Sequence, residues 1–312
     1  MDFSLVYLFA AFGGGLFGAA IGGQPAFIFT GFMVLVGVAT GLTGGEYDFL
    51  TNVAFGPVFG PHIAFAGGVA AVAFAARRGQ VDSGRDIAAP MAGIGDPMPL
   101  IVGGLFGMGG YVVQVVLASV LVAGTTALTD SVALTVAISA VVVRLMFGKT
   151  GPFGTVATEA EERGRFFPGG KQVWVIHQQG WVQASVLGVG SGLLSAWVIT
   201  SVPASQVAAA TTLTFGISAV SLLLLQFGLN GPVTHHMTLP GAVAAAAVVG
   251  AGGPGIAALL AAVAAGVLGA LLGEVVSRLF LIHGDTHVDP PAFAIFAVTS
   301  VVVAVQLATG AV

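Results

Sequence analysis

The chain contains no cysteine, and only 7% of its residues are charged. Without cysteine it can form no disulfide, no thiol-based active site and no cysteine metal site. Soluble domains usually contain about 25% charged residues, so this scarcity of charge excludes an ordinary soluble domain. The nine Lys and Arg residues stand against 13 Asp and Glu residues and form no basic patch, so we expect no nucleic-acid partner.

Motifs for catalysis and nucleotide binding are also absent. The sequence has no nucleophile elbow, no zinc-protease motif and no phosphate-binding loop. We therefore expect neither an enzyme nor an ATP-driven pump, and no bound cofactor. The beginning of the chain, Met1-Asp2-Phe3, lacks the basic region of a signal peptide, so the first apolar segment is expected to be a permanent helix.

Apolar residues dominate the chain, at 56% of the total, with a mean hydropathy of +1.02. The apolar segments are long, which favours membrane helices over the short alternating strands of a membrane barrel. The predicted fold class is an all-α integral membrane protein with about ten transmembrane helices. The ten predicted spans are 4–22, 25–41, 54–76, 97–123, 128–147, 181–200, 203–227, 234–250, 254–281 and 290–309.

The basic residues fall in three places along the chain and predict its orientation. The groups are Arg77, Arg78 and Arg85; then Arg144, Lys149, Arg163, Arg165 and Lys171; and finally Arg278. With ten spans, all three groups lie on one side of the membrane, which is the cytoplasmic side for loops rich in Lys and Arg. We therefore expect a multi-pass protein of the cell (plasma) membrane with both termini outside. With eight spans, Arg278 would lie on the opposite side.

Two halves of the sequence resemble each other. Four short matches occur in the same order: His62–Ala71 with His236–Ala245, Thr129–Val143 with Val288–Val302, Gly95–Pro97 with Gly252–Pro254, and Leu16–Ala19 with Leu193–Ala196. The predicted organisation is a five-helix repeat over 1–150, a cytoplasmic linker over 151–178 and a second five-helix repeat over 179–312. Because five is odd, the second repeat must be inverted relative to the first.

Glycine-rich stretches occur near the middle of the fourth and ninth spans. These are Gly103, Gly104, Gly107, Gly109 and Gly110, and then Gly266, Gly269 and Gly273. Glycine weakens a helix by about 1 kcal/mol relative to alanine, so we expect both helices to be broken there, with close helix packing as the alternative. This arrangement resembles the architecture of sodium/proton antiporters and bile-acid-type sodium symporters. The resemblance implies that broken fourth and ninth helices cross at the site.

Inverted repeats are typical of secondary transporters, whose sites lie near the bilayer midplane. The predicted substrate-binding residues are Gln114 with Gly103, Gly104, Gly107, Gly109, Gly110, Gly266 and Gly269. The predicted ion-coupling residues are Asp96, Asp130, Asp289, His62 and His236, because ionisable groups inside a membrane are usually functional. The alternatives are that the aspartates are helix N-caps and that the histidines form hydrogen bonds at helix ends. Inversion is expected to place Asp130 and Asp289 near opposite faces, and likewise His62 and His236.

Two further groups of ionisable residues are interpreted as structural. Glu274 and Arg278 are spaced as an ion pair on one helix face. His283, Asp285, His287 and Asp289 have spacing that could hold a metal, but a solvated loop is the preferred interpretation and no metal is predicted.

The predicted function is secondary active transport of a small solute or ion by alternating access, coupled to sodium or protons. A passive channel is the alternative, with a membrane-embedded enzyme or a structural subunit further behind. No Lys or Arg is expected at mid-bilayer, which favours a neutral, singly charged or zwitterionic solute, or a cation. The expected partners are the lipid bilayer and this solute, and a homodimer through small-residue helix faces is a further possibility.

Overall fold

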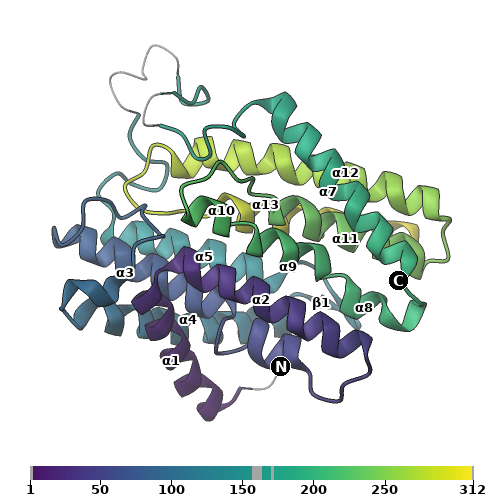
Figure 1. Cartoon of the computed structure of the whole chain (residues 1–312), viewed down its shortest axis with the longest axis horizontal. Helices are drawn as coiled ribbons and strands as arrows, with labels where there is room; N and C mark the ends of the chain where they lie inside the picture. Colours follow the sequence, from purple (N-terminus) through teal and green to yellow (C-terminus); the bar gives the residue numbers. More distant parts are fainter. Residues whose placement is uncertain (1–2, 157–163, 170–171, 311–312) are drawn as a thin grey trace.

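The computed structural model describes residues 3–156, 164–169 and 172–310 and is built almost entirely of helices (Figure 1). Two of the predicted cytoplasmic residues, Arg163 and Lys171, lie outside the described residues, as does part of the predicted linker. Helical segments lie within each of the ten predicted ranges.

The first half contains five main helices with short elements between them. They are α1 (Leu5–Ile21), α2 (Gly23–Leu42), the π-helices η1 (Leu50–Ala54) and η2 (Pro61–Phe65), α3 (Ala66–Arg77), the 3-10 helix η3 (Met91–Ile94), α4 (Met98–Val120), the hairpin β1 (Val122–Ala123) and β2 (Thr126–Ala127), and α5 (Ser131–Phe147). A single residue, Gly22, separates α1 from α2. Its φ of +96° is sterically allowed for glycine but strained for residues with a side chain. The chain can therefore turn at Gly22 without a loop.

The second half has a matching order of helices. They are α7 (Trp181–Ser201), η4 (Ala204–Gln206), α8 (Val207–Ala210), α9 (Leu213–Val220), α10 (Leu223–Gln226), α11 (His235–Gly250), α12 (Gly255–Val276), η5 (Ser277–Leu281) and α13 (Pro290–Thr309). The predicted span 203–227 is thus interrupted twice by turns. Hydroxyl groups of Thr211 and Ser221 donate to carbonyls of the preceding turn, 2.7 Å away in each case, and such bonds compete with regular helix geometry.

Several of these segments meet the length and apolarity needed to cross a bilayer. Within the described residues there are six, namely Gly23–Leu42, Met98–Val120, Trp181–Ser201, Ala204–Gln226, Gly255–Leu281 and Pro290–Thr309. Shorter apolar helices cover Leu5–Ile21, Pro61–Arg77 and Ser131–Phe147. The structure is therefore compatible with a helical membrane protein.

Helix packing follows the same scheme in both halves. In the first half, α4 packs against α1, α3 and α5; in the second, α12 packs against α7, α11 and α13. The halves meet where α2 packs on α9 and α5 on α13. Figure 1 shows the early helices, purple to teal, on one side of the molecule and the later ones, green to yellow, on the other.

The prediction that the fourth and ninth helices are broken is wrong. Helix α4 is continuous from Met98 to Val120, and α12 is continuous from Gly255 to Val276. Their glycines instead allow backbones to approach. A Cβ at Gly103 or Gly107 would overlap α1, and a Cβ at Gly266 would overlap the Gly188 carbonyl oxygen of α7. Close packing between small residues thus offsets the weak helix propensity of glycine.

Candidate functional site

A cavity of about 710 Å³ lies between the two halves of the chain. Residues from α2, α5, α9, α11 and α13 line it, together with η2 and the segments that precede α4 and α7. Pockets of about 300–1,000 Å³ are usual for small molecules, so the cavity has the size of a ligand site.

Two predicted site residues, Asp130 and Asp289, line this cavity from matching positions. Each is the N-cap of the helix that follows: Asp130 accepts a hydrogen bond from the Ala133 amide at 2.8 Å, and Asp289 accepts one from the Ala292 amide at 2.9 Å. Both carboxylates are partly exposed. The N-cap alternative is therefore confirmed for both aspartates, and the two residues line one cavity.

Gln114 and His62 also line the cavity. The Gln114 amide donates to the Ser131 hydroxyl at 3.0 Å and accepts from the Thr135 hydroxyl at 3.3 Å, which ties α4 to the first turn of α5 beside Asp130. His62 lies in the π-helix η2 and is buried. The structure thus brings four predicted site residues to one cavity: Gln114, His62, Asp130 and Asp289.

The remaining predicted site residues lie elsewhere. His236 is buried in α11 beside Trp174, with ring centroids 5.7 Å apart, and does not line the cavity with His62. The glycines of α4 and α12 belong to helix contacts, apart from Gly109, whose surroundings are open. Gly104 faces the Phe12 ring. Gly110 faces the His62 carbonyl oxygen, and in the second half Gly269 faces the His236 carbonyl oxygen in the same way.

Asp96 lies before α4 and outside the cavity. Its carboxylate accepts hydrogen bonds from the Met98 amide at 2.9 Å and the Gln80 side chain at 2.7 Å, and it pairs with Arg78 at 3.6 Å. These hydrogen bonds, followed by the nearby charge of Arg78, lower the pKa of Asp96 below its ordinary value. Its position matches the cap-like alternative.

Sequence reasoning missed part of the cavity wall. His235 and His287 line it, as do the aromatic rings of Phe27, Phe65 and Phe215. The His287 ring nitrogen lies 3.2 Å from the Asp289 carboxylate, and both His283 and His287 are buried. The solvated-loop interpretation of this segment is therefore wrong. No group of three His, Asp or Glu side chains placed to hold a metal occurs among the described residues.

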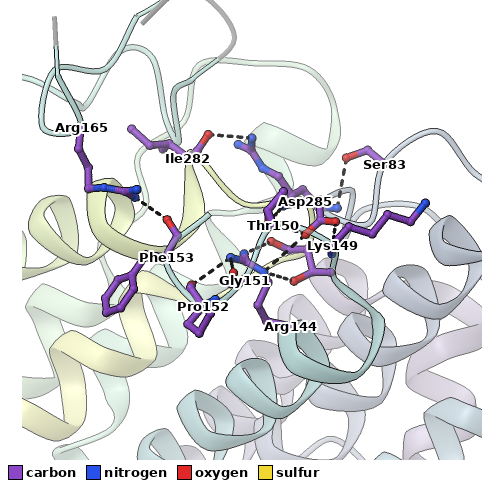
Figure 2. A network of polar contacts seen from close by, with 12 residues as sticks. Ser83, Arg144, Lys149, Thr150, Gly151, Pro152, Phe153, Arg165, Ile282 and Asp285 are labelled. Carbon is purple, nitrogen blue, oxygen red and sulfur yellow. Dashed lines mark hydrogen bonds and ion pairs between the residues drawn. The ribbon is translucent and has the colours of Figure 1, made fainter. Parts of the chain in front are cut away.

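The loop leading to Asp289 is held by a network of polar contacts (Figure 2). Arg144, buried in the last turn of α5, donates to the Thr286 hydroxyl at 2.6 Å and the Thr286 carbonyl at 2.7 Å. It also donates to the Pro152 carbonyl at 3.2 Å and lies 3.9 Å from the Asp285 carboxylate. Arg85 donates to the Ile282 carbonyl at 3.4 Å. Arg144 and Arg85 thus hold the segment between Ile282 and Thr286, shortly before Asp289.

Replacing Arg144 with lysine is expected to lower the free energy of unfolding by about 2 kcal/mol. Lysine keeps the charge but cannot supply the planar set of donors that reaches Thr286 and Pro152 together, and each lost buried bond costs about 1 kcal/mol or more. Thermal melting in detergent measures the change. Lys149→Arg is the control because the Lys149 backbone amide, rather than its side chain, bonds Asp285; equal melting temperatures for Arg144→Lys and the wild type would contradict the prediction.

The predicted Glu274–Arg278 pair is confirmed. The two side chains are buried and lie 3.3 Å apart. Arg278 also stacks on the Trp181 ring at 3.9 Å and donates to the Gln179 carbonyl at 2.6 Å. These contacts join η5, which directly follows α12, to the start of α7.

The apolar helices are compatible with a helical membrane protein, and the cavity between its halves is the candidate site in the described part of the chain. A family model matches residues 1–312, so the chain belongs to the Family of unknown function (DUF7973). No curated protein and no solved structure matches the chain.

Proposed function

We propose that the protein is a secondary active transporter that moves a small solute or ion across the cell membrane by alternating access, coupled to sodium or protons. The proposal rests on the cavity between the halves, which Asp130 and Asp289, the N-caps of two matching helices, line with their side chains. Carboxylates at such a position can bind a cation or proton when the cavity is open to one side of the membrane and release it when the cavity is open to the other.

We infer that the two halves form an inverted five-plus-five arrangement, which is typical of such transporters. The helix pairs of the first half recur in the second, and the Gly110–His62 contact recurs as Gly269–His236. Hydrogen bonds also join segments that ten spans place on the same side. The Gln24 amide donates to Gln226 at 3.2 Å on the proposed inner side, and the Gln206 amide donates to the Leu42 carbonyl at 3.1 Å on the proposed outer side.

The absence of cysteine makes this topology directly testable. We expect single-cysteine variants Glu46→Cys and Ala251→Cys to react with a membrane-impermeant maleimide in intact cells. Asp82→Cys and Asn230→Cys should react only after permeabilisation, because their loops are proposed to be cytoplasmic. All four positions are exposed in the structure. If Ala251 and Asn230 exchange their accessibility, the second repeat is not inverted.

Transport itself is tested with purified protein. A panel of solutes is first screened by thermal melting at varied sodium concentration and pH, since a ligand that binds the native state raises the melting temperature. Solutes that stabilise the protein are then offered to proteoliposomes. The proposal predicts uptake against the solute gradient when a sodium or proton gradient is imposed. Uptake that only equilibrates the solute, whatever ion gradient is present, would indicate a channel instead.

A further inference from the structure

We propose that the central cavity binds an organic monocation, an ammonium group carried on an apolar body. This inference narrows the substrate class of the proposed transporter and rests on the proposed function for movement across the membrane, although binding can be measured without it. Three features of the cavity wall support it: its net negative charge, its aromatic rings, and two helix N-termini that are already capped by carboxylates.

The charged residues of the wall are mainly acidic. Among the described residues, the wall contains the carboxylates of Asp86, Asp130 and Asp289 and one guanidinium, that of Arg85. The formal charge of these four groups is therefore −2. Arg85 is also engaged, since it donates to the Val173 carbonyl at 3.2 Å and the Ile282 carbonyl at 3.4 Å. A cation is favoured in such a cavity, where low-dielectric walls strengthen the field.

Aromatic rings make up much of the remaining wall. Phe27 forms the centre of the group, with its ring centroid 5.9 Å from that of Phe65, 5.8 Å from that of Phe215 and 4.7 Å from that of His235. Phe55 and Trp174 also line the cavity. Aromatic faces attract ammonium groups and are the usual means of recognising quaternary ammonium ligands.

The two helix ends at the cavity do not favour an anion. The N-terminus of a helix attracts negative charge, but here α5 and α13 already have their own carboxylates, Asp130 and Asp289, on their first-turn amides. Two buried imidazoles on the wall, His62 and His235, have Nδ1 atoms without a hydrogen-bond partner in the described part of the chain. The unprotonated ring nitrogen of a neutral imidazole can accept a hydrogen bond from an ammonium N–H.

As the substrate that fills the cavity, in contrast to a coupling ion at one carboxylate, a metal ion or bare sodium fits less well than an organic cation. Hard cations require several oxygen ligands in a small shell, whereas the described residues provide no group of three acidic or imidazole side chains that could hold a metal. The volume of about 710 Å³ also far exceeds that of a single ion. The size, the rings and the net negative charge together favour an apolar ammonium compound.

Isothermal titration of the full chain in detergent tests the inference with benzylammonium as the probe. Phenylacetate and benzyl alcohol serve as anionic and neutral compounds of similar shape. We expect binding of the cation alone. Asp130→Asn should weaken it by about tenfold, and Phe215→Leu by about threefold, as the loss of one cation–π contact implies. Asp96→Asn and Phe29→Leu, whose side chains lie outside the cavity, should bind as the wild type does.

Asparagine caps helices about as well as aspartate, so Asp130→Asn is expected to fold, and circular dichroism checks this. Preference for phenylacetate or benzyl alcohol would overturn the inference, as would cation binding that neither cavity variant weakens. Proteoliposome flux separates this result from the proposed function. If the cation binds as expected but is never driven by an ion gradient, the substrate class stands and the transporter proposal fails. If a gradient drives only neutral or anionic solutes, transport stands and this inference fails.

Discussion

Replacing Gly110 with alanine is expected to destabilise the protein by about 3 kcal/mol or more. A Cβ at this position would overlap the His62 carbonyl oxygen, which belongs to the backbone and cannot rotate away. Overpacking a close contact typically costs about 1–3 kcal/mol and sometimes more. Because η2 carries His62 into the cavity wall, the variant should lose ligand binding together with stability.

The neighbouring residue provides a matched control for this prediction. No atom outside its own helix segment lies within 4 Å of a Cβ placed at Gly109. Gly109→Ala should therefore raise stability by up to about 1 kcal/mol, through helix propensity alone. Both variants are compared by thermal melting in the same detergent. Similar melting temperatures for the two would show that the close approach of α4 to η2 does not limit stability.

Removing the charge of either cavity aspartate is expected to reduce gradient-driven uptake at least about tenfold. Asp130→Asn and Asp289→Asn retain an N-cap acceptor for the Ala133 and Ala292 amides, so the helices should persist while the charge is lost. A carboxylate that binds the coupling ion stabilises it by more than about 1.4 kcal/mol inside a protein, which corresponds to tenfold in affinity. Uptake into proteoliposomes under an imposed sodium or proton gradient is the measurement.

Asp96→Asn is the appropriate control for both variants, because its carboxylate pairs with Arg78 and Gln80 away from the cavity. It should transport at the wild-type rate. If Asp96→Asn is as defective as the other two, the cavity is not the coupling site. If all three variants transport normally, coupling does not depend on these carboxylates.

The sequence was sufficient to predict the helices and some of their ends. Apolar runs predict ten ranges that all contain helix, and N-capping by Asp130 and Asp289, the alternative to their predicted ion-coupling role, is confirmed. The i,i+4 spacing of Glu274 and Arg278 predicted their ion pair. Each of these features depends on residues close together in the chain, where periodicity and propensity are informative.

Features that depend on distant residues could not be predicted in this way. The glycines of α4 indicated a weak helix, but whether a weak helix breaks depends on its neighbours, here Gly15 of α1 and the His62 carbonyl. The aromatic wall of the cavity comes from Phe27, Phe65 and Phe215, on three separate elements, and has no local signature. His62 and His236 match in sequence, yet His62 lines the cavity whereas His236 is buried beside Trp174.

The Arg144–Thr286 contact also limits how the protein can move. Thr286 precedes Asp289 by three residues, and a fully extended chain covers at most about 10 Å in that length. Asp289 therefore stays tethered to the last turn of α5 as long as Arg144 holds both the hydroxyl and the carbonyl of Thr286. The end of α5 and the beginning of α13 must travel as one rigid body, and any hinge that opens the cavity lies outside this pair.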